Sequence, residues 1–201
     1  MANLFDLLQS QLSENLVNQV GKQFGIDSEN QADNAIKDIF GSMMTAMAKN
    51  SQTQQGAESL NNALDRDHDG SLLSNVMDVL SGNTQGMNSS ATNGVGILNH
   101  VFGANALNVG QEISKNTGLD MGKVMSMMVQ FAPLVLSMLG KYKRDNNIDA
   151  NALPKVLTKS AGAYGVEQKG SKNILNVLLD QDNDGSIIDD IAGKVLGGLF
   201  K

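Results

Sequence analysis

The feature that most constrains the fold is an aspartate-rich segment that occurs twice. Residues 65–73, DRDHDGSLL, match residues 180–188, DQDNDGSII, with aspartate at positions one, three and five and glycine at position six. A glycine, an aliphatic residue and an aspartate also recur ahead of each copy, at 25–27 and 118–120. The glycines are 118 − 25 = 93 positions apart and the segments 180 − 65 = 115, so the second copy holds about 22 more residues. These matches predict an internally duplicated chain.

Both halves have the apolar spacing of helices. Every fourth residue from Leu4 to Phe24 is apolar, which predicts one helix ended by Gly25 as a left-handed C-cap. Ser28 and Gln31 form a candidate capping box for a second helix that reaches about Lys49. No segment alternates with the period of a strand, and there are only 2 Tyr and 6 Phe. The predicted fold class is all-α, multihelical, with an aspartate loop in each half.

Further helices are expected before the first loop and in the second half. A short helix is predicted over 57–64, and the additional residues of the second half are expected to form a helix after Asp149 that ends at Gly165. The apolar run 124–139 is shorter than the roughly 20 residues that span a bilayer, so it predicts a buried core helix and no membrane span.

The domain organisation follows from the repeat and from one polar stretch. Residues 81–96 are rich in Gly, Ser, Asn and Thr, a composition typical of flexible connections. We therefore expect a first helical repeat over 1–80, a flexible linker over 81–96 and a second repeat over 97–201.

Composition excludes several classes of function. The absence of cysteine excludes thiol catalysis and thiolate metal sites, and two histidines leave little for imidazole ligation. A net charge of −6 argues against nucleic-acid binding, which requires clustered basic groups. The first residues lack the basic start and apolar core of a secretory signal, so a cytoplasmic location is expected.

The two aspartate loops predict calcium sites. A tight loop can turn alternate carboxylates toward one centre, and glycine permits the bend, as in the first half of an EF-hand. The backbone carbonyl of the serine after glycine is a further ligand, and Leu72 or Ile187 is expected to anchor the loop in the core. The candidate ligands are Asp65, Asp67, Asp69, Ser71, Asp180, Asp182, Asp184, Ser186, Asp189 and Asp190.

The two loops are not equivalent as calcium sites. Position twelve is Val76 in the first loop and Ile191 in the second, where an EF-hand has a bidentate glutamate. Asp189 and Asp190 can supply oxygens in the second loop, whereas the first has only Ser74 and Asn75 there. We expect the second loop to bind calcium more tightly, with the first partly or wholly empty.

The two aspartate loops have two other possible roles besides calcium binding. The aspartates can cap the following helices as solvated connections, without any metal. The segments 67–71 and 182–186 also look like the aspartate nucleophile motif of haloacid-dehalogenase phosphatases, but that motif follows a parallel strand and the residues before Asp67 are helix-like. His68 is expected to be solvent-exposed and His100 to be a helix-end or packing histidine, and no catalytic pair is found.

Eight methionines gather in the two long predicted helices. Packing in the core explains them most simply, and a groove exposed by a calcium sensor is the alternative. They are Met43, Met44, Met47, Met121, Met125, Met127, Met128 and Met138. The leading hypothesis is a non-enzymatic, calcium-binding helical module that interacts with an unidentified protein partner.

Four segments of the second half carry a family resemblance. These are 96–103 (GILNHVFG), Gly118-Leu119, 131–136 (FAPLVL) and 182–190 (DNDGSIIDD). Together they resemble the bacterial YidB-like family of unknown function. The resemblance implies a multihelical bacterial protein with an aspartate-glycine loop near the C-terminus and no assigned activity.

Overall fold

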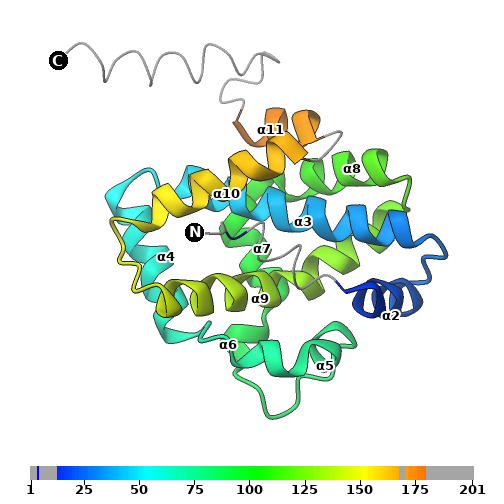
Figure 1. Ribbon diagram of the computed structural model, residues 1–201, viewed down its shortest axis with the longest axis horizontal. Helices are drawn as coiled ribbons and strands as arrows, with labels where there is room; N and C mark the ends of the chain where they lie inside the picture. The colour runs from blue at the N-terminus through cyan, green and yellow to red at the C-terminus, as the bar shows by residue number, and fades with distance from the viewer. Residues whose placement is uncertain (1–3, 5–12, 168–170, 180–201) are drawn as a thin grey trace.

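The computed structural model describes residue 4 and residues 13–167 and 171–179 (Figure 1). Within these residues every regular element is a helix, so the all-α prediction is confirmed. The elements are α2 (Glu14–Phe24), α3 (Glu29–Asn50), α4 (Gln54–Arg66), η1 (Ser71–Asn75), α5 (Val76–Leu80), α6 (Ser89–Thr92), α7 (Gly94–Phe102), η2 (Gly103–Asn105), α8 (Ala106–Thr117), α9 (Met121–Asp145), α10 (Leu153–Glu167) and α11 (Ser171–Leu179).

Local sequence signals set most helix ends. Gly25 and Gly118 take the left-handed conformation, with φ of 62° and 71°, and end α2 and α8 as predicted. Ser28 Oγ accepts a hydrogen bond from the Gln31 backbone N–H, which is one half of the predicted capping box. The Gln31 side-chain amide donates to the Thr117 carbonyl, so this residue also has a tertiary partner.

The predicted continuous helix from Leu4 to Phe24 is wrong. Ser13 is extended, with ψ of 151°, and its hydroxyl accepts a hydrogen bond from the Leu16 N–H as the N-cap of α2. A serine in this extended conformation interrupts a continuous helix, although the apolar spacing runs through it.

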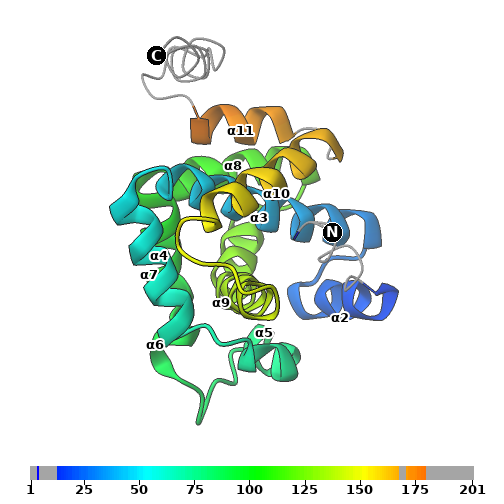
Figure 2. The same ribbon diagram turned by 60° about the vertical axis from the view of Figure 1, so that its left-hand side comes forward.

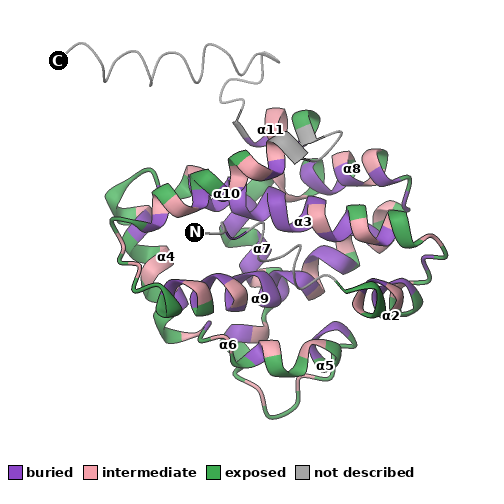
Figure 3. Ribbon diagram, viewed as in Figure 1, coloured by how far each residue is buried: buried purple, intermediate pink, exposed green. Residues whose placement is uncertain are grey.

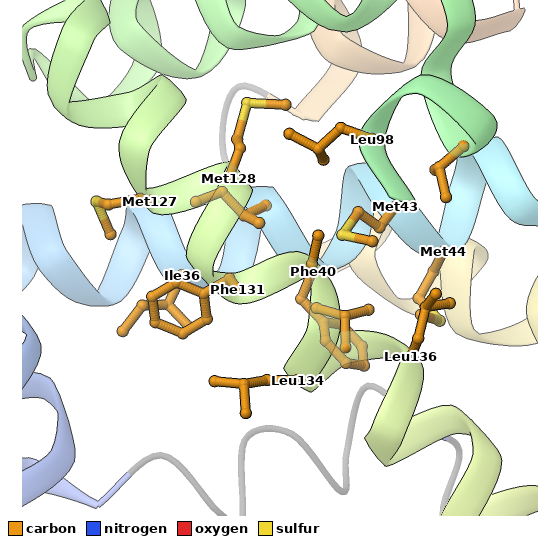
Figure 4. Close-up of a cluster of buried hydrophobic side chains, with 14 of the residues drawn as sticks. Ile36, Phe40, Met43, Met44, Leu98, Met127, Met128, Phe131, Leu134 and Leu136 are labelled. Carbon is orange, nitrogen blue, oxygen red and sulfur yellow. The ribbon is translucent and has the colours of Figure 1, made fainter. Parts of the chain in front are cut away.

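The two longest described helices, α3 and α9, form the centre of the core. Both are largely buried (Figure 3), and their side chains meet in the cluster drawn in Figure 4, which includes Phe40 and Met43 of α3 and Met128 and Phe131 of α9. Met43, Met44, Met47, Met127 and Met128 are at most 2 % exposed. These five of the eight methionines fill the core, which is the simpler of the two interpretations, and Met121, Met125 and Met138 are partly buried.

Of the helices that the structure describes, α9 is the one that is long and apolar enough to cross a membrane. The helix α9 has 25 residues and extends beyond both ends of the predicted core helix over 124–139. Most of its apolar stretch is buried against other helices, which is typical of a central core helix.

The long helix of each half packs against elements of the other half. α10 lies along α3 in both views (Figures 1 and 2), and α8 and α11 also pack on α3. α9 in turn contacts α4, η1 and α5. The division into 1–80, 81–96 and 97–201 stays a prediction. Described residues before and after the 81–96 stretch pack in the same hydrophobic core.

Side-chain contacts between the halves are paired. The Gln31 amide donates to the Thr117 carbonyl at the end of α8, and the Lys123 ammonium donates to the Gly25 carbonyl after α2. Near the other ends of the long helices, Lys49 of α3 reaches α11 and Lys143 of α9 reaches α4. The first turn and the last turn of each long helix thus bind the opposite half.

The expected linker, 81–96, is partly helical. It contains α6 and the first residues of α7, and the side chain of Asn88 caps α6. Ala91 is 2 % exposed. The expected extra helix after Asp149 is present as α10, which passes Gly165 and ends at Glu167.

Candidate functional site

The first aspartate loop joins α4 to η1. Gly70 has a φ of 85°, and Asp69 Oδ1 accepts a hydrogen bond of 2.9 Å from the Ser71 N–H. Glycine is the residue that adopts this conformation without a steric penalty, and the aspartate stabilises the turn. Leu72 is 4 % exposed, so it anchors the loop in the core as predicted.

The backbone of this loop lies directly on α9, which the flanking elements α4 and η1 also contact. A Cβ atom added to Gly140 would lie 1.8 Å from the His68 carbonyl oxygen, and one added to Gly70 would lie 2.9 Å from Lys141 Cβ. Real Cβ atoms do not approach backbone so closely, so the absence of a side chain at Gly140 permits the contact. The loop is therefore a docking element as well as a turn.

Asp65 pairs with a buried lysine of α9. Lys143 Nζ lies 2.5 Å from Asp65 Oδ1, and the Asn61 amide donates to Asp65 Oδ2 at 3.1 Å. The Lys143 side chain is 10 % exposed and that of Asp65 49 %. A buried ammonium needs such a partner because its desolvation is otherwise uncompensated.

The other two carboxylates have separate partners. Asp67 accepts two hydrogen bonds from the Arg66 guanidinium, which holds the pKa of Asp67 below its usual value. Hydrogen bonds from Ser71 lower the pKa of Asp69, with a smaller contribution from the charge of Arg144. Each carboxylate of the loop thus faces a donor or a basic group of the protein.

The predicted ligands of the first loop are near in sequence but are not gathered around one point. In the part of the chain that the structure describes, no group of three His, Cys, Asp or Glu side chains is arranged to hold a metal ion. Asp180, Asp182, Asp184, Ser186, Asp189 and Asp190 lie outside the described residues. Calcium binding by either loop stays a prediction.

The expectation that His68 is exposed is wrong. His68 is 4 % exposed, and its Nδ1 is buried without a hydrogen-bond partner among the described residues. Burial lowers the pKa of its imidazole. His68 is two residues past the end of α4, in the loop segment whose backbone carbonyl lies against Gly140 of α9, a tertiary contact that the sequence did not reveal. His100, in contrast, is in the last turn of α7, as predicted.

A buried polar group that the sequence did not reveal joins three helices. Asp38 of α3 is 2 % exposed and accepts a hydrogen bond of 3.1 Å from the Tyr164 hydroxyl of α10. Burial raises the pKa of Asp38 to about 6, although hydrogen bonds from Tyr164 and from Asn116 of α8 favour its charged form. Burial and the nearby Asp38 charge raise the pKa of Tyr164. The Tyr164 ring packs where a side chain on Gly41 would stand.

Comparison with known proteins gives one family. A family model described as bacterial protein of unknown function (DUF937) matches residues 6–142, which include the first aspartate loop and end before the second. No curated protein and no solved structure matches the chain.

Proposed function

Since the chain belongs to the family described as bacterial protein of unknown function (DUF937), we propose from its own residues that it is a non-enzymatic, calcium-stabilised helical scaffold for a protein partner. The observation that carries this proposal is the aspartate motif that occurs twice in the sequence, of which the first copy docks its backbone on α9 at Gly140. A loop held in this way fixes the ends of the two elements that it joins. A cytoplasmic location and the finer likeness to YidB-like proteins are part of the same proposal.

The paired contacts support an internal duplication in which the long helix of each half binds a helix of the other half. Lys143 of α9 holds Asp65 at the end of α4. Lys49, at the matching end of α3, donates to the Leu178 carbonyl of α11 at 2.7 Å. In both halves a lysine in the last turn of the long helix thus binds the helix that precedes an aspartate segment in the sequence.

The charge of the second loop favours calcium there. Residues 65–75 contain three aspartates and Arg66, whereas residues 180–190 contain five aspartates and no basic residue. Carboxylates crowded in this way repel one another unless a cation lies among them, and carboxylate oxygen is the ligand that calcium prefers. We propose the second loop as the calcium site.

The setting of the first loop supports a non-enzymatic role. A haloacid-dehalogenase phosphatase needs its nucleophilic aspartate at the carboxyl end of a parallel strand. Asp67 instead follows α4, and its carboxylate accepts hydrogen bonds from Arg66. We propose that neither loop supplies a nucleophile.

Calcium is expected to bind the chelator-treated protein and to raise its melting temperature. A ligand that binds only the folded state stabilises it by about 3 kcal/mol at a hundred times its dissociation constant. Isothermal titration calorimetry and thermal unfolding monitored by circular dichroism would measure both effects. Magnesium at equal concentration is the control, because it is smaller and keeps its water. No heat and no thermal shift with millimolar calcium would disprove the proposal.

A structural calcium site makes a further prediction that a sensor does not. The methionines of α3 and α9 are in the core, so calcium should leave the fluorescence of a hydrophobic dye such as ANS unchanged or reduce it. A sensor that opens a methionine-lined groove would increase the fluorescence. Dye binding measured with calcium and with chelator separates the two functions.

A further inference from the structure

We propose that Lys143 is the resident cation of the first aspartate loop and that it makes this loop independent of metal. The inference rests on the proposed function, since it states which of the two loops takes calcium. Lys143 comes from α9, 78 residues away from Asp65 in sequence, and its ammonium lies 2.5 Å from the first carboxylate of the motif. A metal ion at this loop would have to displace a buried charge of the protein itself.

Other groups of the protein engage the remaining two carboxylates of the first loop. The Arg66 guanidinium lies 2.6 Å from Asp67 Oδ2, and the Ser71 N–H donates to Asp69 Oδ1 at 2.9 Å. Each of the three carboxylates at positions one, three and five thus has a cation or a hydrogen-bond donor of the protein as its partner. The side chains that would bind calcium are engaged before any ion arrives.

The sequence positions that match Lys143 and Arg66 are neutral. Counted from the glycine turns, Lys143 is 143 − 118 = 25 residues after Gly118, and the residue 25 positions after Gly25 is Asn50. Lys49, one position earlier, donates its ammonium to a backbone carbonyl, that of Leu178. By the loop offset of 115, Arg66 corresponds to Gln181. The second loop, which the proposed function makes the calcium site, thus lacks counterparts of Lys143 and Arg66, and we expect one calcium ion per chain.

The test counts calcium ions bound by the wild-type protein and by Lys143→Met, using calorimetry. Methionine fills the buried position without a charge, so Asp65 loses its counter-ion and the first loop gains an affinity for calcium. We expect one ion for the wild type and two for Lys143→Met, and calcium should restore much of the melting temperature that the variant loses without metal. Lys143→Gln replaces this variant if its helical circular dichroism signal is lost.

Two matched variants exclude a general effect of charge. Lys141→Met removes the same charge from the same turn of α9, but the Lys141 ammonium pairs with Asp145, and methionine keeps the Cβ that packs beside Gly70 of the loop. It should bind as many ions as the wild type. Adding Asp65→Asn to Lys143→Met removes the carboxylate that Lys143 neutralises and should return the count to that of the wild type.

The inference and the proposed function fail in different ways. The proposed function depends on the wild-type count, and zero ions would remove it. The role of Lys143 depends on the difference between Lys143→Met and the wild type, which should be one ion whatever the wild-type count is. Equal counts for the two proteins, or two ions on the wild type, would overturn the role of Lys143.

Discussion

Gly140→Ala is expected to destabilise the protein by about 3 kcal/mol, an effect at the upper end of those seen for overpacked sites. The added methyl carbon would lie 1.8 Å from the His68 carbonyl oxygen and 3.5 Å from that of Leu64. Both neighbours are backbone atoms, so no side chain can rotate away, and the loop must lift from α9. Urea unfolding followed by circular dichroism would measure the loss.

Gly162→Ala is the matched control. It is also a glycine inside a helix, but a Cβ there meets nothing within 4 Å, so alanine should gain about 1 kcal/mol through its higher helix propensity. The same substitution is thus predicted to have opposite signs at two positions. If Gly140→Ala were as stable as the wild type, the loop would not be docked on α9 as described.

Asp38→Asn is expected to stabilise the protein by about 3 kcal/mol at pH 8 and by little at pH 4. The folded-state pKa of Asp38, about 6, is above the ordinary value of 3.8, so the folded protein holds a proton that the unfolded chain releases between these values. The contribution of Asp38 to stability is therefore present at low pH, falls as the pH rises from about 4 to 6, and stays lost above 6. A shift of about two units corresponds to about 3 kcal/mol.

The measurement is urea unfolding of both proteins from pH 4 to pH 8, and the difference between them is the quantity of interest. The amide oxygen that Asp38→Asn introduces still accepts the hydrogen bond of the Tyr164 hydroxyl, but the variant has no charge to bury at this position. Asp33→Asn is the control, because Asp33 is on the same helix but is partly exposed and pairs with Lys37. Asp33→Asn should not stabilise the protein, because it removes a partly exposed ion pair and no buried charge. A difference between Asp38→Asn and wild type that does not grow with pH would show that the Asp38 charge costs nothing in the fold.

The sequence by itself determined the helical class and most local boundaries. Gly25 and Gly118 end helices because each position requires a positive φ, and Asp120 caps α9 through its own neighbours, the N–H groups of Gly122 and Lys123. The helix after Asp149 was likewise predictable, since its apolar face is a property of spacing within fifteen residues. Such features involve residues close in the chain, whose geometry a short pattern constrains.

The tertiary structure alone decided which partners these elements meet. Asp65 was predicted as a metal ligand. The residues around it in the sequence do not indicate that its partner is Lys143, which is 78 positions away. In the sequence, Asp38 is only an acidic residue within an apolar pattern. Its hydrogen-bond partner, Tyr164, is 126 positions later and is brought to it by the fold. Because contacts between distant segments depend on how helices pack and not on local spacing, the charge that each aspartate faces could be known only from the folded chain.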